Sequence, residues 1–344
     1  KLWVNGEQVT SWNTQTNSAQ NTNYEMNTAV THYIGAEKGN TGGSFGNYFD
    51  GSMSHFNFID GTAYDASYFG ETDATTGEWK IKTSPSVTYG NNGFFILKDG
   101  NSVTDQSGNG NNWTVSGGTL TNTEDNPSNV FATGNTLLKP HSNITFSNGN
   151  LTAVEGGTDW GSLVSTIGAS KGKHYAEMKW QSGTYFIAGV TSEDALMSTA
   201  GTAGFSGKFN YGVGYDKSAQ YQKDANGTWT AHGTAYSVGD IIGIAMDLDN
   251  SYVYFSKNGV WQNSGDPTSG ATGTGGIALT SVSTAGNYFI SASPNTSTIH
   301  MNFGNGYFGT TAVASAGTNA SGNGIFEYDV PSGYTALCTK GLNL

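Results

Sequence analysis

Two acidic residues, Asp247 and Asp249, stand two positions apart in the second half of the chain. Side chains at positions i and i+2 of a strand share one face of a sheet, so this pair has the spacing that acid–base chemistry by two carboxylates could use. The spacing also suits a hairpin end, where a carboxylate accepts hydrogen bonds from backbone N–H groups. A Glu-x-Asp-x-x-Glu strand is absent, so glycoside cleavage by paired carboxylates has little support and the hairpin role is preferred.

Aromatic side chains in polar, loop-like segments suit ligand contact. Such rings can stack on the faces of sugars or fill a pocket of a partner. The candidate ligand-binding residues are Trp160, Tyr221, Trp229 and His232. Trp160 and Trp229 are the pair expected to be exposed, whereas Trp261 is expected to lie towards a core. Packing at the mouth of a β-sandwich is an equal alternative for the two tryptophans.

Two sequence motifs of other functional sites match in residue spacing but lack the structural context that those sites require. Residues 304–309 have the G-x-G-x-x-G spacing of a dinucleotide site, and residues 42–46 the G-x-S-x-G spacing of a nucleophile elbow. Neither has the strand and helix that such sites need. The six histidines are never within five residues of one another, so no local zinc motif exists. We therefore predict no catalytic residue, metal ligand or cofactor, although the Asp and Asn residues of 99–112 could hold a structural Ca²⁺ ion.

The composition is typical of an all-β chain. Fifty of the 344 residues are Gly, and 18 Tyr, 17 Phe and 8 Trp supply the apolar area that a disordered chain lacks. Apolar residues do not recur at helical spacing over any long segment, so helix should be minor. The length suggests two domains. The single cysteine, Cys338, excludes an intrachain disulfide and is expected to be a small buried side chain.

The charge excludes several partners. All 14 cationic residues are Lys, and the net charge is −12. A chain without Arg and with this charge is not expected to bind nucleic acid, which needs a cationic surface, or to dock on anionic lipid. The apolar runs are too short to insert into a membrane.

Residues 239–260 predict a three-strand meander. Ile242 and Ile244 belong to an alternating strand, a turn follows at Asp249, and a second strand rich in aromatic residues runs from Tyr252. Asn258-Gly259 then fits a type I′ hairpin, in which both residues have positive φ. This segment resembles the signature of the SPRY (B30.2-like) domain, in which a Gly-Asp-x-Ile-Gly strand leads through Asp-Leu-Asp-Asn into a Phe-x-Lys-Asn-Gly hairpin.

The resemblance widens on both sides of this segment. The further matching stretches are Lys171-Gly-Lys-His-Tyr-Ala-Glu, Ala188-Gly-Val-Thr, Tyr211-Gly-Val-Gly-Tyr-Asp, Ile299-His-Met-Asn-Phe-Gly and Pro331-Ser-Gly-Tyr-Thr-Ala-Leu. The resemblance covers residues 146–344 and implies an antiparallel jelly-roll β-sandwich over that range.

The first part of the chain resembles the C-terminal half of a laminin-G-like (concanavalin A-like) sandwich, over residues 1–97. An Asn5-Gly6 hairpin opens it, and Tyr-Ile-Gly at 33–35 and Phe-Asp-Gly at 49–51 carry the likeness. No strand pattern precedes the first hairpin, whereas about 90 residues of it precede the hairpin at Asn258-Gly259. We therefore expect this sandwich to be incomplete, with the missing strands supplied by a neighbouring chain or a longer polypeptide. Residues 98–145 are expected to form an ordered Gly/Asn-rich connector on one sandwich, packed through Trp113, Leu120, Phe131 and Leu137-Leu138.

The order of these segments is similar to that of bacteriophage tail-fibre and virion-appendage proteins, especially marine ones. The resemblance implies a non-enzymatic protein on the virion surface or outside cells, adhering to host-surface glycans or proteins. Its further partners would be other virion subunits and copies of itself. Two alternatives remain open: a secreted or cell-surface bacterial adhesin, and a polysaccharide depolymerase, which would need paired carboxylates in a cleft.

Overall fold

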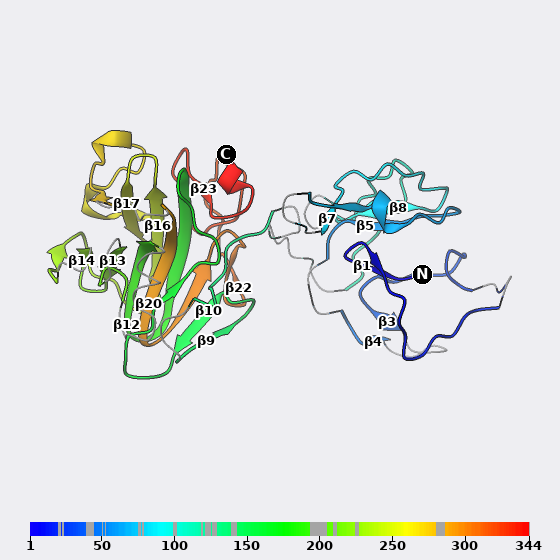
Figure 1. The fold of residues 1–344 in the computed structure, drawn as a ribbon, viewed down its shortest axis with the longest axis horizontal. Helices are drawn as coiled ribbons and strands as arrows, with labels where there is room; N and C mark the ends of the chain where they lie inside the picture. Colours follow the sequence, from blue (N-terminus) through cyan, green and yellow to red (C-terminus); the bar gives the residue numbers. More distant parts are fainter. Residues whose placement is uncertain are drawn as a thin grey trace. The chain divides into compact units, whose positions relative to one another are not determined.

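The computed structural model describes residues 1–19, 22, 24–38, 45–49, 51, 53–74, 77, 79–98, 102–117, 120, 125, 129–138, 143–192, 205–208, 212–223, 227–279 and 286–343. The chain divides into two units, Lys1–Ser128 and Asn129–Leu344. Both are drawn in Figure 1, coloured from blue at the N-terminus to red at the C-terminus. Tyr211 of the expected motifs and residues 42–44 of the G-x-S-x-G match lie outside the described residues.

The first unit holds short antiparallel strand pairs: β1 with β2, β3 with β4, β5 with β8 and β6 with β7. Its elements are β1 Trp3–Val4, β2 Glu7–Gln8, β3 Glu37–Lys38, β4 Phe45–Gly46, β5 Phe56–Phe58, η1 Ala66–Tyr68, β6 Gly70–Thr72, β7 Trp79–Ile81 and β8 Phe94–Ile96.

The second unit is strand-rich, and its helical segments are short 3₁₀ turns. Its elements are β9 Ile144–Ser147, β10 Thr152–Glu155, β11 Leu163–Val164, β12 Lys173–Ser192, β13 Gly212–Asp216, β14 Gln220–Lys223, β15 Thr230–Ala231, β16 Ile241–Asp247, β17 Tyr252–Lys257, β18 Val260–Trp261, η2 Gln262–Ser264, η3 Gly270–Thr272, β19 Ile277–Ala278, β20 Tyr288–Asn302, β21 Tyr307–Phe308, β22 Thr311–Ala312, β23 Thr335–Ala336 and η4 Gly341–Asn343. The described residues therefore confirm the predicted all-β, mainly antiparallel fold with little helix.

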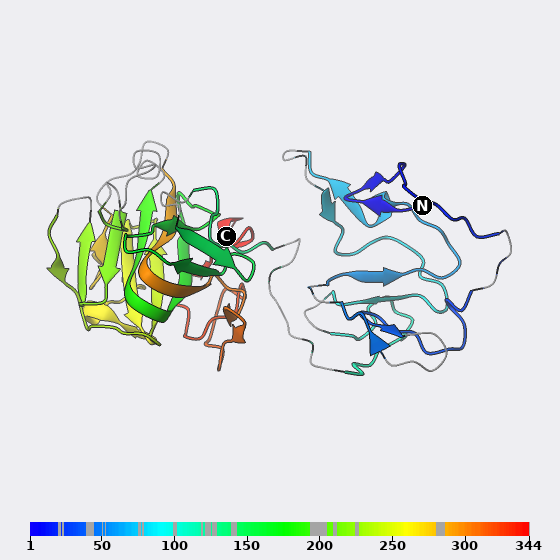
Figure 2. The same cartoon turned by 90° about the horizontal axis from the view of Figure 1, so that it is seen from below.

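Two long strands, β12 and β20, run antiparallel and connect both layers of the second unit (Figure 1). The first part of β12 pairs with β16, and its last part pairs with β13. Between them the register shifts from Trp180 to Ser182, and residues 181–185 are exposed. Figure 2 shows both strands curving. One layer thus carries β16, β17, β9 and β10, and the other carries β13, β14, β15 and β11.

The core lies between these layers. Met178, Ile244 and Phe255 from the first layer and Val190 from the second belong to one buried apolar cluster. Tyr215 of β13 stacks on Phe255 of β17 with ring centroids 5.2 Å apart, so the two layers are in direct contact. The sequence predicted that β16 has alternating inward- and outward-facing side chains. All seven of its residues are nevertheless buried, so both of its faces are covered.

A second cluster explains why β16 is buried on both faces. The C-terminal segment lies on the outer face of the first layer, where Phe326 and Tyr334 pack with Tyr175 and Tyr254. Cys338 belongs to the same cluster and is fully buried, as predicted. A parallel β12–β23 contact continues the attachment of this segment.

Glu177 fixes the C-terminal segment to the sheet. Its fully buried carboxylate accepts hydrogen bonds from the backbone N–H groups of Glu327 (2.8 Å) and Tyr328 (2.9 Å). The Tyr175 hydroxyl (3.1 Å) and the Asn302 amide (3.3 Å) donate to it as well. Burial nevertheless raises the pKa of Glu177 to about 7, against the opposing effect of these donors.

Both Asn-Gly turns are tight hairpins, as predicted. Val4 pairs with Glu7 around Asn5-Gly6, and Lys257 pairs with Val260 around Asn258-Gly259. All four turn residues have positive φ, between 48° and 83°, which is the requirement of a type I′ turn. The second turn is also tied to β16, because Asn258 Oδ1 accepts a hydrogen bond from the Ile241 N–H at 2.9 Å.

The first unit buries little apolar surface within the described residues. Its buried hydrophobic residues are Tyr89, Phe94, Phe95 and Ile96. Trp3, Ile34, Phe56 and Phe58 are only partly buried. Large side chains such as Met26, at 67 % exposure, and Tyr48, at 68 %, face solvent.

The segment 98–145 contributes to both units rather than standing apart from them. Trp113 contacts Phe94 of the first unit with ring centroids 4.9 Å apart, and Phe131 is buried in the second unit. Leu137 is 91 % exposed, so the expectation that it packs against a sandwich is wrong. Leu137 lies in a tight turn, in which Asn135 Oδ1 accepts hydrogen bonds from the N–H groups of Leu137 and Leu138.

Replacing Gly259 with Ala should lower the free energy of unfolding of the second unit by ~2–3 kcal/mol. The new Cβ would lie 2.6 Å from the Tyr328 ring in addition to occupying a left-handed backbone position. Gly333→Ala is the matched control, since Gly333 has φ +84° with no atom within 4 Å and should cost only ~1 kcal/mol. Chemical denaturation measures both, and equal losses would contradict the packing of the hairpin against Tyr328.

The pH dependence of stability should carry the signature of Glu177. Its pKa is raised from 4.5 to about 7 in the fold, so its protonated form stabilises the fold below pH ~4.5 and this contribution is lost as the pH rises through ~7. The free energy of unfolding, relative to that of Glu177→Gln, should fall over this window by at most ~1.4 kcal/mol per pH unit. Denaturation curves from pH 4 to 8 test this, and a difference that rises with pH would contradict it.

Candidate aromatic binding site

A hollow of about 420 Å³ lies on the outer face of the second layer. Its lining residues are Trp160, Tyr185, Ile187, Phe205, Asp216, Trp229 and Asn295. We call it the aromatic hollow. Its volume falls within the roughly 300–1,000 Å³ typical of small-molecule sites.

The strands of the second layer form the floor of the hollow. Tyr185 and Ile187 are two positions apart on β12 and therefore share a face. Tyr185 is paired with Asn295 of β20, and Ile187 is paired with Asp216 of β13. Backbone pairing thus fixes the positions of an apolar side chain, a carboxylate and an amide side by side.

Four aromatic rings follow one another along the hollow. Trp229 and Phe205 are stacked, with ring centroids 5.5 Å apart and an interplanar angle of 25°. Phe205 also contacts Trp160 at 5.2 Å, and Trp160 contacts Tyr185 edge-on at 5.7 Å. Each ring is only partly buried or exposed, so the row presents aromatic surface to solvent.

Ser206 positions Phe205. Its backbone N–H donates to Ser293 Oγ at 2.9 Å, and its hydroxyl shares hydrogen bonds with Ser291 (2.8 Å) and Ser293 (3.2 Å). The side chain is buried. This approach requires Gly214 beneath it, since a Cβ there would lie 1.8 Å from the Ser206 carbonyl oxygen. Small residues on the sheet therefore hold the adjacent aromatic ring in place.

One carboxylate and a neighbouring lysine set the charge of the hollow. Asp216 Oδ1 accepts the backbone N–H groups of Ser218 (3.0 Å) and Gln220 (3.1 Å), and burial raises the pKa of Asp216. The Lys217 ammonium donates to the Thr184 carbonyl at 2.9 Å and lies 3.5 Å from the centre of the Tyr185 ring. Lys217 thus already occupies one face of that ring.

The structure brings two of the four candidate residues together at the hollow, Trp160 and Trp229. The other two lie elsewhere: Tyr221 packs partly buried against the core, and His232 is buried between Tyr215 and Tyr221. Burial lowers the pKa of His232 to about 4. Trp261 packs against the second buried cluster, in line with its expected position towards a core.

Sequence reasoning missed Tyr185 and Phe205. Tyr185 lies within β12, where its exposure depends on the bend of that strand, and Phe205 depends on the docking of Ser206. The available signal for the position of Phe205 is that several predicted strand residues are small, which allows another segment to lie close to the sheet. These residues are Gly189, Gly214, Ser291 and Ser293.

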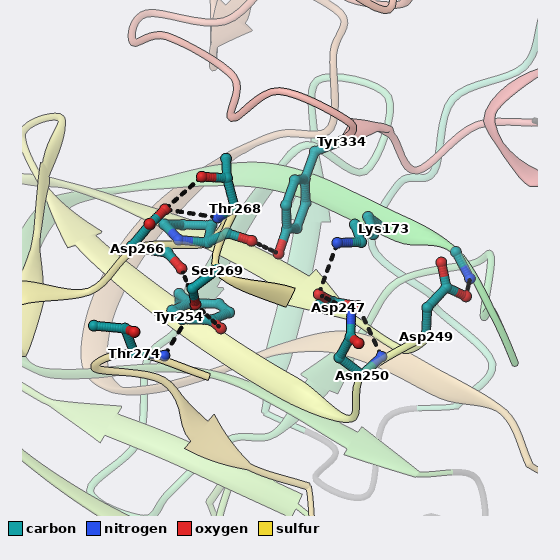
Figure 3. A network of polar contacts seen from close by, with 12 residues as sticks. Lys173, Asp247, Asp249, Asn250, Tyr254, Asp266, Thr268, Ser269, Thr274 and Tyr334 are labelled. Carbon is teal, nitrogen blue, oxygen red and sulfur yellow. Dashed lines mark hydrogen bonds and ion pairs between the residues drawn. The ribbon is translucent and has the colours of Figure 1, made fainter. Parts of the chain in front are cut away.

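Asp247 and Asp249 have structural roles (Figure 3). The buried Asp247 carboxylate lies 3.0 Å from the Lys173 ammonium and accepts the Asn250 N–H at 3.0 Å and the Asn250 amide at 2.9 Å. Asp249 accepts the N–H of Gly172 at 2.8 Å. Both close the β16–β17 turn onto the start of β12, which is the hairpin role preferred from the sequence.

The loop considered for calcium is organised around Asp105. Its carboxylate accepts the N–H groups of Phe95, Ser107 and Asn111 and the Ser107 hydroxyl, at 2.8–2.9 Å. Hydrogen-bond donors thus fill the positions where a cation would bind. Across the described ranges there is no group of three His, Cys, Asp or Glu residues placed to hold a metal, and no described helix is long and apolar enough to cross a membrane.

No family model matches the chain. A curated relative is the ATP-dependent RNA helicase DDX1 of Xenopus laevis, 31 % identical over 101 residues. The match covers 29 % of this chain and 12 % of that protein, so the chain spans only a small part of this relative.

Solved structures similar to the chain include SPRY domains. The SPRY domain of human HERC1 is 12 % identical over 49 % of this chain and 96 % of its own, with a TM-score of 0.36. A second human SPRY domain is 15 % identical over 46 % and 94 %, with a TM-score of 0.34. Stonustoxin is 20 % identical over 50 % and 27 %, with a TM-score of 0.35. The fold assignment itself rests on the strand topology described above.

Replacing Gly214 with Ala should displace the docked segment 205–208 and separate Phe205 from Trp229. Overpacking of this kind costs ~1–3 kcal/mol, and the near-ultraviolet circular dichroism of the stacked rings should weaken. Gly212→Ala on the same strand is the control, because its nearest atom would be 3.3 Å away. An unchanged aromatic signal in Gly214→Ala would show that Ser206 does not position Phe205.

Proposed function

We propose that this chain is a non-enzymatic phage virion-appendage or surface protein and that the aromatic hollow of its SPRY-like second unit contacts the host-surface ligand. The observation that supports this most is the row of four aromatic rings held by a rigid sheet and a docked segment. Aromatic side chains with fixed geometry contribute large contact area with little loss of conformational freedom on binding.

The chemistry of the hollow favours binding over catalysis. Its lining includes one carboxylate, Asp216, which serves the turn that follows β13. Hydrolysis of a polysaccharide by two carboxylates needs a pair ~5–10 Å apart across the cleaved bond. The depolymerase alternative therefore draws no support from the lining, whereas the bacterial-adhesin alternative would use the same hollow in a different cellular setting.

The first unit is proposed to be covered by neighbouring chains. Its exposed hydrophobic residues include Val4, Met26, Tyr48 and Phe49, each more than half exposed. Soluble monomers rarely leave large contiguous apolar surfaces open to water. Another virion subunit or a second copy of the chain that adds strands to these short pairs would bury this surface. Many copies on one particle would also strengthen weak individual contacts.

Replacing both Trp160 and Trp229 with Ala should reduce adsorption of the protein, or of particles that display it, to host cells by at least ~10-fold, since loss of a stacking aromatic costs a few kcal/mol. Trp12→Ala, an exposed tryptophan of the first unit, is the matched control. Circular dichroism confirms that each variant is folded. Adsorption that persists without both hollow tryptophans would exclude the hollow as the contact site.

A further inference from the structure

We infer that the aromatic hollow takes a neutral pyranose sugar at the end of a glycan chain. This inference rests on the proposed binding role of the hollow and adds the chemical class of the ligand. It comes from three properties of the hollow: the arrangement of its rings, the polar groups on its floor, and its charge.

The rings match the apolar face of a sugar. A pyranose presents C–H groups on one face and hydroxyls around its edge, so it binds where an aromatic plane lies next to hydrogen-bonding groups. Phe205 and Trp229 are stacked with ring centroids 5.5 Å apart, so each ring covers part of the other's face and the aromatic surface left open belongs to their outer faces and edges. The partly buried Trp160 lies at 5.2 Å from Phe205, tilted by 56°, and adds a second aromatic face to the hollow.

The floor supplies hydrogen-bond acceptors beside these rings. The Asp216 carboxylate accepts two backbone N–H groups at Oδ1 and a hydrogen bond from the Ser218 side chain, and because a carboxylate has about four lone-pair sites, some acceptor capacity remains. The Asn295 amide donates to the Thr158 carbonyl at 3.0 Å, and its oxygen accepts a long contact of 3.4 Å from the Thr296 hydroxyl. Asp216 on β13 and Asn295 on β20 flank β12, two strand spacings or about 10 Å apart, so they can accept hydrogen bonds from hydroxyls on opposite sides of a sugar.

The charges disfavour an acidic ligand. The ionisable group in the lining is a carboxylate, and the chain carries a net charge of −12. Lys217, next to the hollow, is already held by the Thr184 carbonyl and the Tyr185 ring. Lys208 lies 5.9 Å from the Phe205 ring centre but is exposed, where water and salt screen its charge. Among the described residues, the lining thus offers an acidic sugar one carboxylate and no cation of its own.

The same features disfavour a cationic ligand and a broad protein surface. An ammonium group would compete with Lys217, which already lies over Tyr185. A protein partner commonly contacts about 20–30 residues on each side, whereas seven residues line this open hollow. A terminal sugar fits this space and leaves the rest of its chain in solvent.

The test titrates the full chain with lactose, maltose, N,N′-diacetylchitobiose and 3′-sialyllactose, using tryptophan fluorescence and calorimetry. At least one neutral sugar should bind, and 3′-sialyllactose should bind at least ~10-fold more weakly than lactose if lactose is that sugar. Phe205→Ala should weaken binding of the neutral sugar at least ~10-fold, Trp229→Phe should retain most of it, and Trp12→Ala should leave it unchanged. Phe205→Ala alters no hydrogen bond of Ser206.

The outcomes separate the ligand class from the binding role. Binding of none of the neutral sugars, or equal or tighter binding of 3′-sialyllactose, would overturn the inference. If sugars fail to bind while adsorption to host cells still depends on Trp160 and Trp229, the hollow binds a protein, so the ligand class is wrong and the proposed function stands. If adsorption is independent of both tryptophans, the proposed function fails, whatever the sugars do.

Discussion

The pairing of β12 with β20 is the interaction on which the second unit depends. These two strands run together through both layers, and each layer adds its remaining strands to one part of the pair. The bend of β12 after Trp180 turns one layer over the other and encloses the core. The same bend exposes Tyr185 and sets Ile187 beside Asp216, so the floor of the aromatic hollow is a consequence of how the sandwich closes.

Polar groups then determine what lies on the two outer faces. On the first layer, the buried Glu177 carboxylate binds the backbone of the C-terminal segment, which covers Tyr175 and Tyr254. On the second layer, serines and glycines leave room for Ser206 to dock, which brings Phe205 between the two tryptophans. One face is therefore covered by the chain's own C-terminal segment, whereas the other leaves aromatic rings partly exposed to solvent.

Much of the fold could be predicted from the sequence because the signals are local. The Asn258-Gly259 turn, the alternation of β16 and the absence of helical periodicity each depend on neighbouring residues. Trp160 and Trp229 could be named for the same reason, since both stand in polar loops. Tyr221 and His232 have similar neighbours in the sequence, but strand pairing directs them to the core, and Phe205 depends on contacts with residues more than 80 positions away. Whether an aromatic side chain is buried or lines the hollow therefore depends on tertiary packing, which the neighbouring residues in the sequence do not determine.

The central claim is that the four rings of the aromatic hollow are the surface that meets the host. Hydroxyl-radical footprinting with mass spectrometry tests this most directly, by comparing side-chain oxidation of the free protein with that of the protein bound to host cells. The account predicts protection of Trp160, Tyr185, Phe205 and Trp229 on binding, with oxidation of the buried His232 low in both states and that of the partly buried Tyr221 unchanged by binding. Unchanged oxidation of these four rings while the protein is bound to cells would contradict it.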